Sequence, residues 1–320
     1  MKHFDRILAV AGESDKGNAA LAHATALAAA NDAELTVVDV KPYLDEYTRA
    51  LADIMPGDEL RELVLAHRRE QLERLLKSAD KTGERSAQAK VLDGVPFIEI
   101  IREAVRGRYG LIVKAAESEF GPRARIFGST DMHLMRKSPV PILVINPETP
   151  RPATRIMAAV DALSDDDDAD PLNRRILTMA QAMVDVAGAE LHVLSAWELI
   201  GEDAMRHSPF LKIGDDRVDA LLHQTEARLQ ARQSALLEWY SRTFPSGGTP
   251  AAHRIRGEAR QVIGSFVDDQ SIDLAVMGTV GRAGVPGLLI GNTAETVLSD
   301  VGCSVLTIKP EGFLTPVTGD

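Results

Sequence analysis

The feature that most constrains this chain is an internal repeat that covers nearly all of its 320 residues. Three matched places lie 163 positions apart, namely Gly94 and Gly257, Val113 and Val276, and the starts of Gly128-Ser129-Thr130 and Gly291-Asn292-Thr293. Near the first strand of each copy the offset is only 149, from Gly12 to Asp161. The second copy has therefore gained its additional residues in loops, which is typical of a duplicated domain. We expect two domains, residues 1–150 and 151–320, divided in the proline-rich segment 147–152.

Short apolar runs alternate with helical segments in both copies. In the first copy, strands are expected at residues 6–11, 35–40, 87–92, 111–115 and 140–145, with helices at 18–30, 58–81 and 96–106 and another that opens at Gly128. The second copy repeats this plan, with strands at 155–160, 272–276 and 303–308 and a helix at 172–187. This alternation predicts an α/β fold in which helices cover both faces of a parallel sheet.

A glycine-dense loop follows the strand at 272–276. Residues 277–293 read M-G-T-V-G-R-A-G-V-P-G-L-L-I-G-N-T, and the last two are good residues to start a helix. Glycines let backbone N–H groups converge on an anion, and a helix N-terminus adds unpaired N–H groups and partial positive charge. The loop lacks the lysine of a P-loop and the G-x-G-x-x-G of a dinucleotide fold. It predicts another kind of phosphate site; the alternative is a surface loop that merely tolerates glycine.

Composition limits the partners and the compartment. The formal net charge of −11 argues against nucleic acid or an anionic membrane surface as the main partner. The single cysteine, Cys303, excludes an internal disulfide and suits a reducing compartment. No signal-peptide pattern and no apolar run of membrane-spanning length is present, so we expect a cytoplasmic protein.

The repeat ending in G-x2-G-x9-G-[S/T/N] resembles the universal stress protein family, most closely its tandem, two-domain E type. The resemblance is carried by the second-half signature Gly278-Thr279-Val280-Gly281-Arg282 with Gly291-Asn292-Thr293, by residues 131–137, and by the tail at 309–317. It implies an adenine-nucleotide α-hydrolase-like sheet with strand order 3-2-1-4-5 in each domain, and two domains packed as a pseudo-dimer. It also implies a role in the stress response and, because the glycine signature is present, ATP binding.

Carried over position by position, the resemblance implies one ATP site, in the second domain. Its residues would be Asp161 near the adenosine, Ala196 offering backbone contacts to adenine, Met277 and Gly278 flanking base and ribose, and Gly281, Gly291, Asn292 and Thr293 holding phosphates. Arg282 either pairs with a phosphate or lies in solvent. The site also falls where open α/β sheets bind ligands, at the carboxyl ends of the strands.

The first half departs from this pattern. Gly12, Ala115 and Ser118 stand at the positions of Asp161, Gly278 and Gly281. Losing loop glycines restricts the backbone angles that close phosphate approach requires. We expect the first half to be structural or to bind something else, although its helix start at Gly128 could still accept an anion.

No catalytic residue is assigned. The histidines show no metal-ligand spacing, and no G-x-S-x-G elbow or linked Ser-His-Asp set occurs. The acidic run 164–170 lies on the same rim as the expected ATP site and is either a solvated loop or a site for Mg²⁺ or Mn²⁺. The metal ligands therefore stay unassigned.

Two apolar-rich segments, 42–57 and 197–214, follow the second strand of each copy. They predict either a lid that fills the core between the domains or a pocket for a lipid-like or aromatic ligand. The leading function is an ATP-binding stress-response regulator with little or no turnover. The alternatives are a slow ATPase or nucleotidyl-transfer enzyme, and a carrier or scaffold for a hydrophobic small molecule. Protein partners and a homodimer both remain open.

Overall fold

The computed structural model describes residues 3–12, 15–41, 49–50, 54–79, 87–117, 127–149, 152–164, 169–208, 210, 213–279, 294, 297–298 and 300–317. Its strands are β1 (Arg6–Val10), β2 (Glu34–Lys41), β3 (Gln88–Asp93), β4 (Leu111–Ala115), β5 (Ile142–Ile145), β6 (Arg155–Ala159), β7 (Glu190–Trp197), β8 (Ala251–Arg256), β9 (Leu274–Gly278) and β10 (Ser304–Ile308). Its helices are α1 (Asp15–Asn31), α3 (Gly57–Ala79), α4 (Pro96–Arg106), α5 (Ser129–Lys137), α6 (Ala169–Ala187), α7 (Glu202–His207), α8 (Asp215–Thr243) and α9 (Ala259–Asp269).

The strands form one ten-stranded sheet in the order β3-β2-β1-β4-β5-β10-β9-β6-β7-β8. Each half therefore has the order 3-2-1-4-5, with parallel neighbours throughout. The halves meet where β5 and β10 pair antiparallel, with Leu143 opposite Leu306. These two leucines occupy the same position of the repeat, so a pseudo-twofold axis passes between them. The predicted α/β fold and its pseudo-dimeric packing are confirmed.

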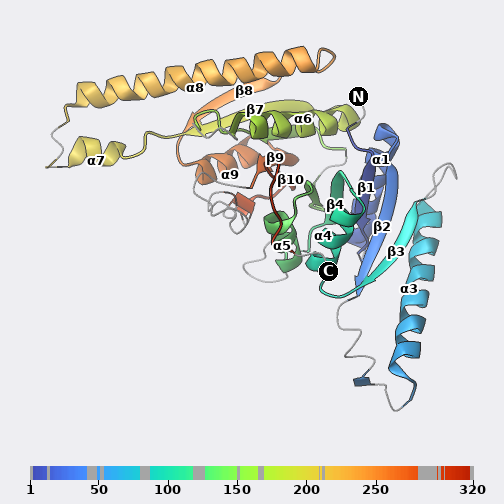
Figure 1. Cartoon of the computed structure of the whole chain (residues 1–320). Coiled ribbons are helices and arrows are strands. Elements are labelled where there is room, and N and C mark those ends of the chain that lie inside the picture. The colour runs from blue at the N-terminus through green and yellow to red at the C-terminus, as the bar shows by residue number, and fades with distance from the viewer. Residues whose placement is uncertain are drawn as a thin grey trace.

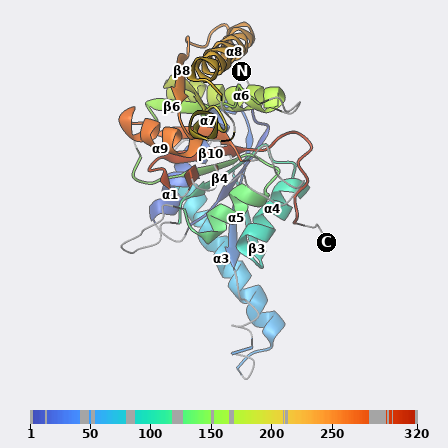
Figure 2. The ribbon, with the colours of Figure 1, turned by 90° about the vertical axis from the view of Figure 1, so that its left-hand side faces the viewer.

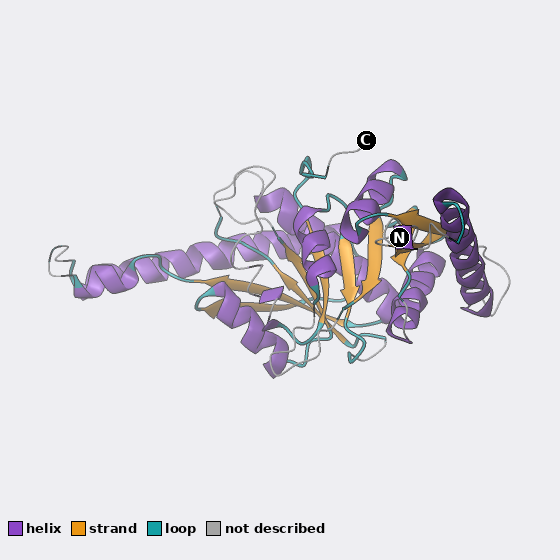
Figure 3. Cartoon of the chain, turned by 90° about the horizontal axis from the view of Figure 1, so that it is seen from below, coloured by secondary structure: helices purple, strands orange, loops and turns teal. Residues whose placement is uncertain are grey.

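Helices cover both faces of the sheet (Figure 3). Alternate residues along the strands point to opposite faces and form two apolar layers with these helices. On one face, Ile7 and Ala9 of β1 pack with buried residues of α1, α6 and α8. On the other face, Leu8 and Val10 pack with buried residues of α4, α5 and α9. Both layers continue across the junction of β5 and β10, so the two halves share their cores.

The backbone has the same conformation in both halves at the turn that follows the third strand, after β3 and after β8. Gly94 and Gly257 adopt φ values of 139° and 148°, which L side chains rarely adopt. Their N–H groups donate to equivalent carbonyls, Gly94 to Lys41 at 3.2 Å and Gly257 to Trp197 at 2.8 Å. The same turn is therefore built twice.

The two long helices α3 and α8 lie at opposite ends of the molecule (Figures 1 and 2). The predicted lid over the junction is wrong for the described parts of the two apolar segments, because Ile54, Ile200 and Phe210 are exposed. Trp197 is instead buried with Ala162 and the α8 residue Leu229. Among the described helices, none is long and apolar enough to span a bilayer.

Candidate functional site

The candidate site lies at the carboxyl ends of β6, β7 and β9 in the second half. Parallel strands present these ends at one edge of the sheet, where α/β folds bind ligands. Four of the nine predicted site residues lie in the described part of the chain there: Asp161, Ala196, Met277 and Gly278. The other five, Gly281, Arg282, Gly291, Asn292 and Thr293, lie outside the described residues, as does most of the acidic run.

Asp161 begins the loop that follows β6. Its Oδ1 accepts hydrogen bonds from the backbone N–H groups of Leu163 (3.3 Å) and Ser164 (3.1 Å), which closes a turn. The Asp161 backbone also exchanges two hydrogen bonds with the side-chain amide of Asn173 on α6, at 3.0 and 2.9 Å. Asp161 is thus held at the rim by both its side chain and its backbone.

Ala196 lies beyond the point where β6 stops pairing with β7. The Leu194 carbonyl accepts the Val160 N–H at 2.9 Å on the β6 side, and the Trp197 carbonyl accepts the Gly257 N–H at 2.8 Å on the β8 side. Because backbone groups alternate sides along a strand, Ala196 directs its N–H and C=O toward β6, which has already ended at Ala159. These groups therefore face the rim of the sheet beyond the end of β6.

Met277 and Gly278 end β9. Met277 is buried in the α4–α5–α9 layer. A Cβ built on Gly278 would lie 3.1 Å from Cδ2 of Leu172, so glycine lets the start of α6 approach the strand closely. Thr279 follows, fully buried, and its hydroxyl donates to the carbonyl of Met135 at 3.5 Å. The beginning of the glycine loop is therefore anchored on α5 of the first half.

The equivalent place in the first half is filled by a buried ion pair. Nζ of Lys114 lies 2.8 Å from Oδ1 of Asp131 and 2.7 Å from Oε1 of Glu117. The second oxygen of Asp131 accepts the backbone N–H groups of Glu117 (2.8 Å) and Gly128 (3.0 Å). Burial raises the pKa of the Asp131 carboxyl, and the Lys114 ammonium opposes that shift. The carboxylate thus accepts the N–H of Gly128, the residue before α5, together with that of Glu117 at the end of the preceding loop segment.

The expectation that the helix start at Gly128 could accept an anion stays a prediction, and such an anion would lie beside the Asp131 carboxylate. Repeat positions 163 residues on carry Met277 for Lys114 and Ala294 for Asp131. Ala294 is buried and has no polar side chain. The sequence contains two signals of the pair: an acidic residue three positions after Gly128, as in a capping box, and a lysine inside an apolar strand.

Sequence reasoning also missed Lys309, which follows β10 and is only 3% exposed. Its Nζ donates to the Thr279 hydroxyl and lies 4.8 Å from the ring centre of Phe313. Within the described chain it forms no ion pair. Burial, with repulsion from Arg136, lowers the pKa of Lys309 to about 7. The Lys309 amine therefore lies at the start of the glycine loop and changes its charge near pH 7.

Other reactive residues have structural surroundings. The His133 ring stacks on Phe97 with centroids 4.4 Å apart, as expected for a packing residue. Cys303 is buried, and burial raises the pKa of its thiol to about 12. Across the described ranges, no group of three or more His, Cys, Asp or Glu residues could hold a metal ion.

This chain belongs to the doubly wound α/β class. It contains two five-stranded units, and the polar rim of each lies at the carboxyl ends of its strands. The universal stress protein family model matches residues 3–146 and 153–309, so the chain belongs to that family of stress-response proteins. It is 28% identical to universal stress protein E of Escherichia coli K12 over 228 residues, covering 70% of this chain and 68% of that protein. The same protein of Salmonella typhi is 28% identical over 229 residues, covering 70% and 69%. The resemblance to the tandem E type is confirmed.

Solved structures share the whole architecture. A functionally unknown protein from Pseudomonas aeruginosa PAO1 superposes with a TM-score of 0.70 at 25% identity, covering 98% of this chain and 95% of that one. A universal stress protein from Archaeoglobus fulgidus gives a TM-score of 0.61 at 18% identity, covering 95% and 98%. The second comparison shows that the fold persists where little sequence similarity is left.

Proposed function

We propose that this chain is a cytoplasmic, ATP-binding stress-response protein with one nucleotide site, at the rim of β6, β7 and β9 in the second domain (151–320). The first domain (1–150) is proposed to be a structural partner with a degenerate site. ATP acts as a bound signal with little or no turnover, since no general base is assigned near the phosphates.

The observation that carries this proposal is the difference between the two halves at one repeat position. In the first half, the Asp131 carboxylate takes the N–H groups of Glu117 and Gly128 and is balanced by Lys114. In the second half, Ala294 and Met277 supply neither charge. The equivalent backbone donors of the second half, Val280 and Gly291, are thereby left for a phosphate, next to Gly281, Asn292 and Thr293.

The described residues suit the other end of the nucleotide. Ala196 offers an N–H and a C=O beyond the end of β6, where an adenine edge would pair. Asp161 lies beside this strand end, held by Leu163, Ser164 and Asn173. A carboxylate accepts hydrogen bonds from ribose hydroxyls well. Mg²⁺ or Mn²⁺ would enter with the triphosphate, and no protein ligand is assigned to it.

Calorimetric titration with ATP tests the site. Wild type is expected to bind, and Gly281→Val is expected to lose binding because a β-branched side chain blocks close phosphate approach. Ser118→Val alters the matching position of the first half and is the control, with binding unchanged. Equal losses in both variants, or no binding by folded wild type, would contradict the proposal.

Turnover separates the proposed regulator from an enzyme. Phosphate or pyrophosphate release with Mg²⁺ or Mn²⁺ is expected to stay at background over many minutes. Turnover that disappears in Asp161→Ala while ATP binding remains would favour the slow ATPase or nucleotidyl-transfer alternative. Mass spectrometry of the purified protein distinguishes bound nucleotide from the hydrophobic ligand of a carrier.

A further inference from the structure

Three aromatic rings join β7, β8 and α9 at the outer edge of the second half, and we call them the histidine cluster. The imidazoles of His192 on β7 and His253 on β8 stack with centroids 5.3 Å apart, and Nδ1 of His192 lies 3.1 Å from Nε2 of His253. The ring of Phe266 on α9 contacts both edge-on, with its centroid 6.1 Å from that of His192 and 4.7 Å from that of His253. Because β8 ends the sheet and pairs with β7 alone, the cluster lies where the second half can open at least cost.

The hydrogen bond between the two imidazoles requires at least one neutral ring. One ring nitrogen donates its proton, and the other accepts it through a lone pair that an imidazolium no longer has. His192 is 8% exposed, and its second nitrogen, Nε2, is buried without a hydrogen-bond partner. A first proton would therefore place a charge on a buried pair. A second proton would break the hydrogen bond and set two like charges side by side.

The neighbouring elements supply little compensating charge. Oε2 of Glu190 on β7 lies 3.9 Å from Nε2 of His192, but the Glu190 side chain is 76% exposed and lies 3.8 Å from Nε of Arg155 on β6. Helix α9 contacts the cluster through Phe266, and its charged residues, Arg260, Asp268 and Asp269, are exposed. Helix α8 reaches β8 through a neutral side chain, Gln233, which bonds the His253 carbonyl at 3.1 Å and Arg254 at 2.8 Å.

These surroundings oppose protonation. Burial lowers the pKa of His192, and Arg155 lowers it further, while Glu190 acts in the opposite direction. Burial and the neighbouring His192 lower the pKa of His253 as well. The folded pair therefore takes up protons less readily than two histidines in the unfolded chain.

The first half builds the same place with an ion pair. Lys90 lies opposite Val38 in the sheet as His253 lies opposite Leu194, and Glu103 precedes Phe266 by 163 positions. Nζ of Lys90 lies 2.6 Å from Oε1 of Glu103, which is 5% exposed and also accepts the Tyr109 hydroxyl at 3.3 Å. The position of His192 is taken by Thr36, which does not titrate. A positive charge at this edge thus has a buried carboxylate partner in the first half and a phenyl ring in the second.

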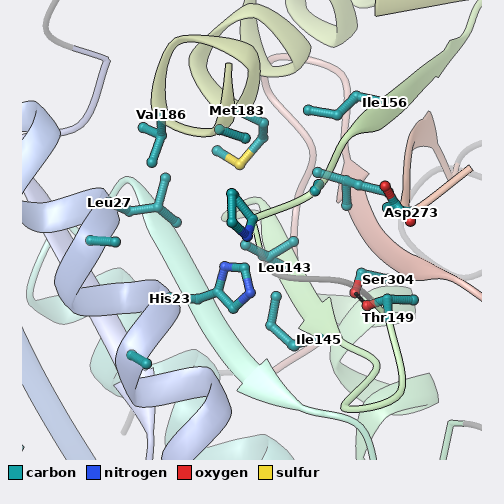
Figure 4. Close-up of a pocket in the computed structure, with 16 residues that line it drawn as sticks. His23, Leu27, Leu143, Ile145, Thr149, Ile156, Met183, Val186, Asp273 and Ser304 are labelled. Carbon is teal, nitrogen blue, oxygen red and sulfur yellow. Dashed lines mark hydrogen bonds between the residues drawn. The ribbon is translucent and has the colours of Figure 1, made fainter. Parts of the chain in front are cut away.

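The other histidines lie away from β7, β8 and α9. His23 lines a cavity of about 320 Å³ at the junction of the halves, and Figure 4 shows its ring extending from α1 into that space. His133 stacks on Phe97 of α4, and His223 is exposed on α8. An effect of pH that is confined to β8 and α9 would therefore come from His192 and His253.

We propose that the histidine cluster is an acid-sensitive latch: protonation of His192 and His253 releases β8 and α9 from β7, while the equivalent edge of the first half stays closed. The latch is separate from the nucleotide rim and does not depend on ATP binding. Because both pKa values are lowered in the folded state, the latch is fully stable above the ordinary histidine pKa of 6.5 and weakens as the pH falls below it. The equilibrium for opening should rise by up to about tenfold per pH unit for each histidine.

Hydrogen–deuterium exchange with detection by mass spectrometry tests the latch at pH 7.5 and pH 5.5, after correction for the intrinsic pH dependence of exchange. Protection of β8 and α9 is expected to fall at least about tenfold at pH 5.5, while protection of β3 and α4 changes by less than about twofold. The two halves of one chain are compared in the same sample, so a general loss of stability would appear in both.

Two variants remove the latch in different ways. His192→Thr/His253→Lys/Phe266→Glu installs the residues of the first half, and His192→Thr/His253→Gln removes both imidazoles without adding a charge. Each is expected to lose the pH response of β8 and α9, while His223→Gln, outside the cluster, should keep it. Circular dichroism at both pH values confirms folding. Equal responses in the two halves of wild type, no response in either half, or a full response in a folded cluster variant would overturn the proposal.

Discussion

The buried pair of Lys114 and Asp131 gives a quantitative test of how charge is balanced at the start of α5. Asp131 is fully buried and accepts three hydrogen bonds, from Lys114 Nζ and from the N–H groups of Glu117 and Gly128. Removing one member of a buried pair strands the other, which typically costs about 3–5 kcal/mol. We expect Lys114→Met to lower the free energy of unfolding by an amount in this range, and Asp131→Ala to reach its lower end, because Glu117 still pairs with Lys114.

The double variant Lys114→Met/Asp131→Ala installs the residues of the second half. It leaves no buried charge without a partner, because Glu117, which loses Lys114, has a half-exposed side chain. The two backbone donors lose their acceptor, so the cost should fall short of the sum of the single costs by at least about 2 kcal/mol. Urea unfolding should be followed by far-UV circular dichroism, because both tryptophans, Trp197 and Trp239, lie in the second half. The account of a buried, mutually dependent ion pair would be refuted if the loss of the double variant equalled the sum of the two single losses. Single losses below about 1 kcal/mol would also refute it.

Two further predictions follow from the structure. Lys309 is protonated in the unfolded chain up to its ordinary pKa of 10.5 but has a folded pKa of about 7, so stability should rise with pH between these values, by about 1.4 kcal/mol per unit. Lys309→Met should flatten this rise and be more stable than wild type at pH 7; equal slopes from pH 7 to 9 would contradict it. Gly94→Ala and Gly257→Ala should each destabilise the folded protein by about 1–2 kcal/mol, because both glycines have a positive φ. Thermal unfolding measures the two losses of stability, and a large difference between them would contradict the equivalence of the two turns.

Much of the fold could be predicted because the two copies of the repeat show the same order of strands and helices, so each assignment in one copy could be compared with the other. The strand at 111–115 and the helix at 96–106 have the predicted bounds, and β10 begins one residue later than expected. These segments combine continuous apolar runs with turn residues at both ends, so local pattern and tertiary burial agree. The packing of the two halves as a pseudo-dimer followed from the resemblance, whereas the antiparallel pairing of β5 with β10 is known from the structure alone.

The features that sequence reasoning missed depend on contacts between distant residues. Nothing local shows that Lys114 reaches a carboxylate seventeen positions away, or that Lys309 is buried against Thr279. The apolar content of the segment that contains Ile200 and Phe210 does not say which surface those side chains face, and both are exposed. The described site residues lie at the predicted edge of the sheet, while their contacts with a nucleotide stay a prediction.

The stoichiometry of ATP binding tests the central claim most directly. Calorimetry should be run on wild type, on Lys114→Met/Asp131→Ala, and on Met277→Lys/Ala294→Asp, which transfers the first-half pair into the second half. One ATP per chain is expected for wild type and for the first-half variant, and none for folded Met277→Lys/Ala294→Asp. Two ATP molecules per wild-type chain, or binding retained in the second-half variant and lost in the first-half variant, would contradict a single nucleotide site in the second domain.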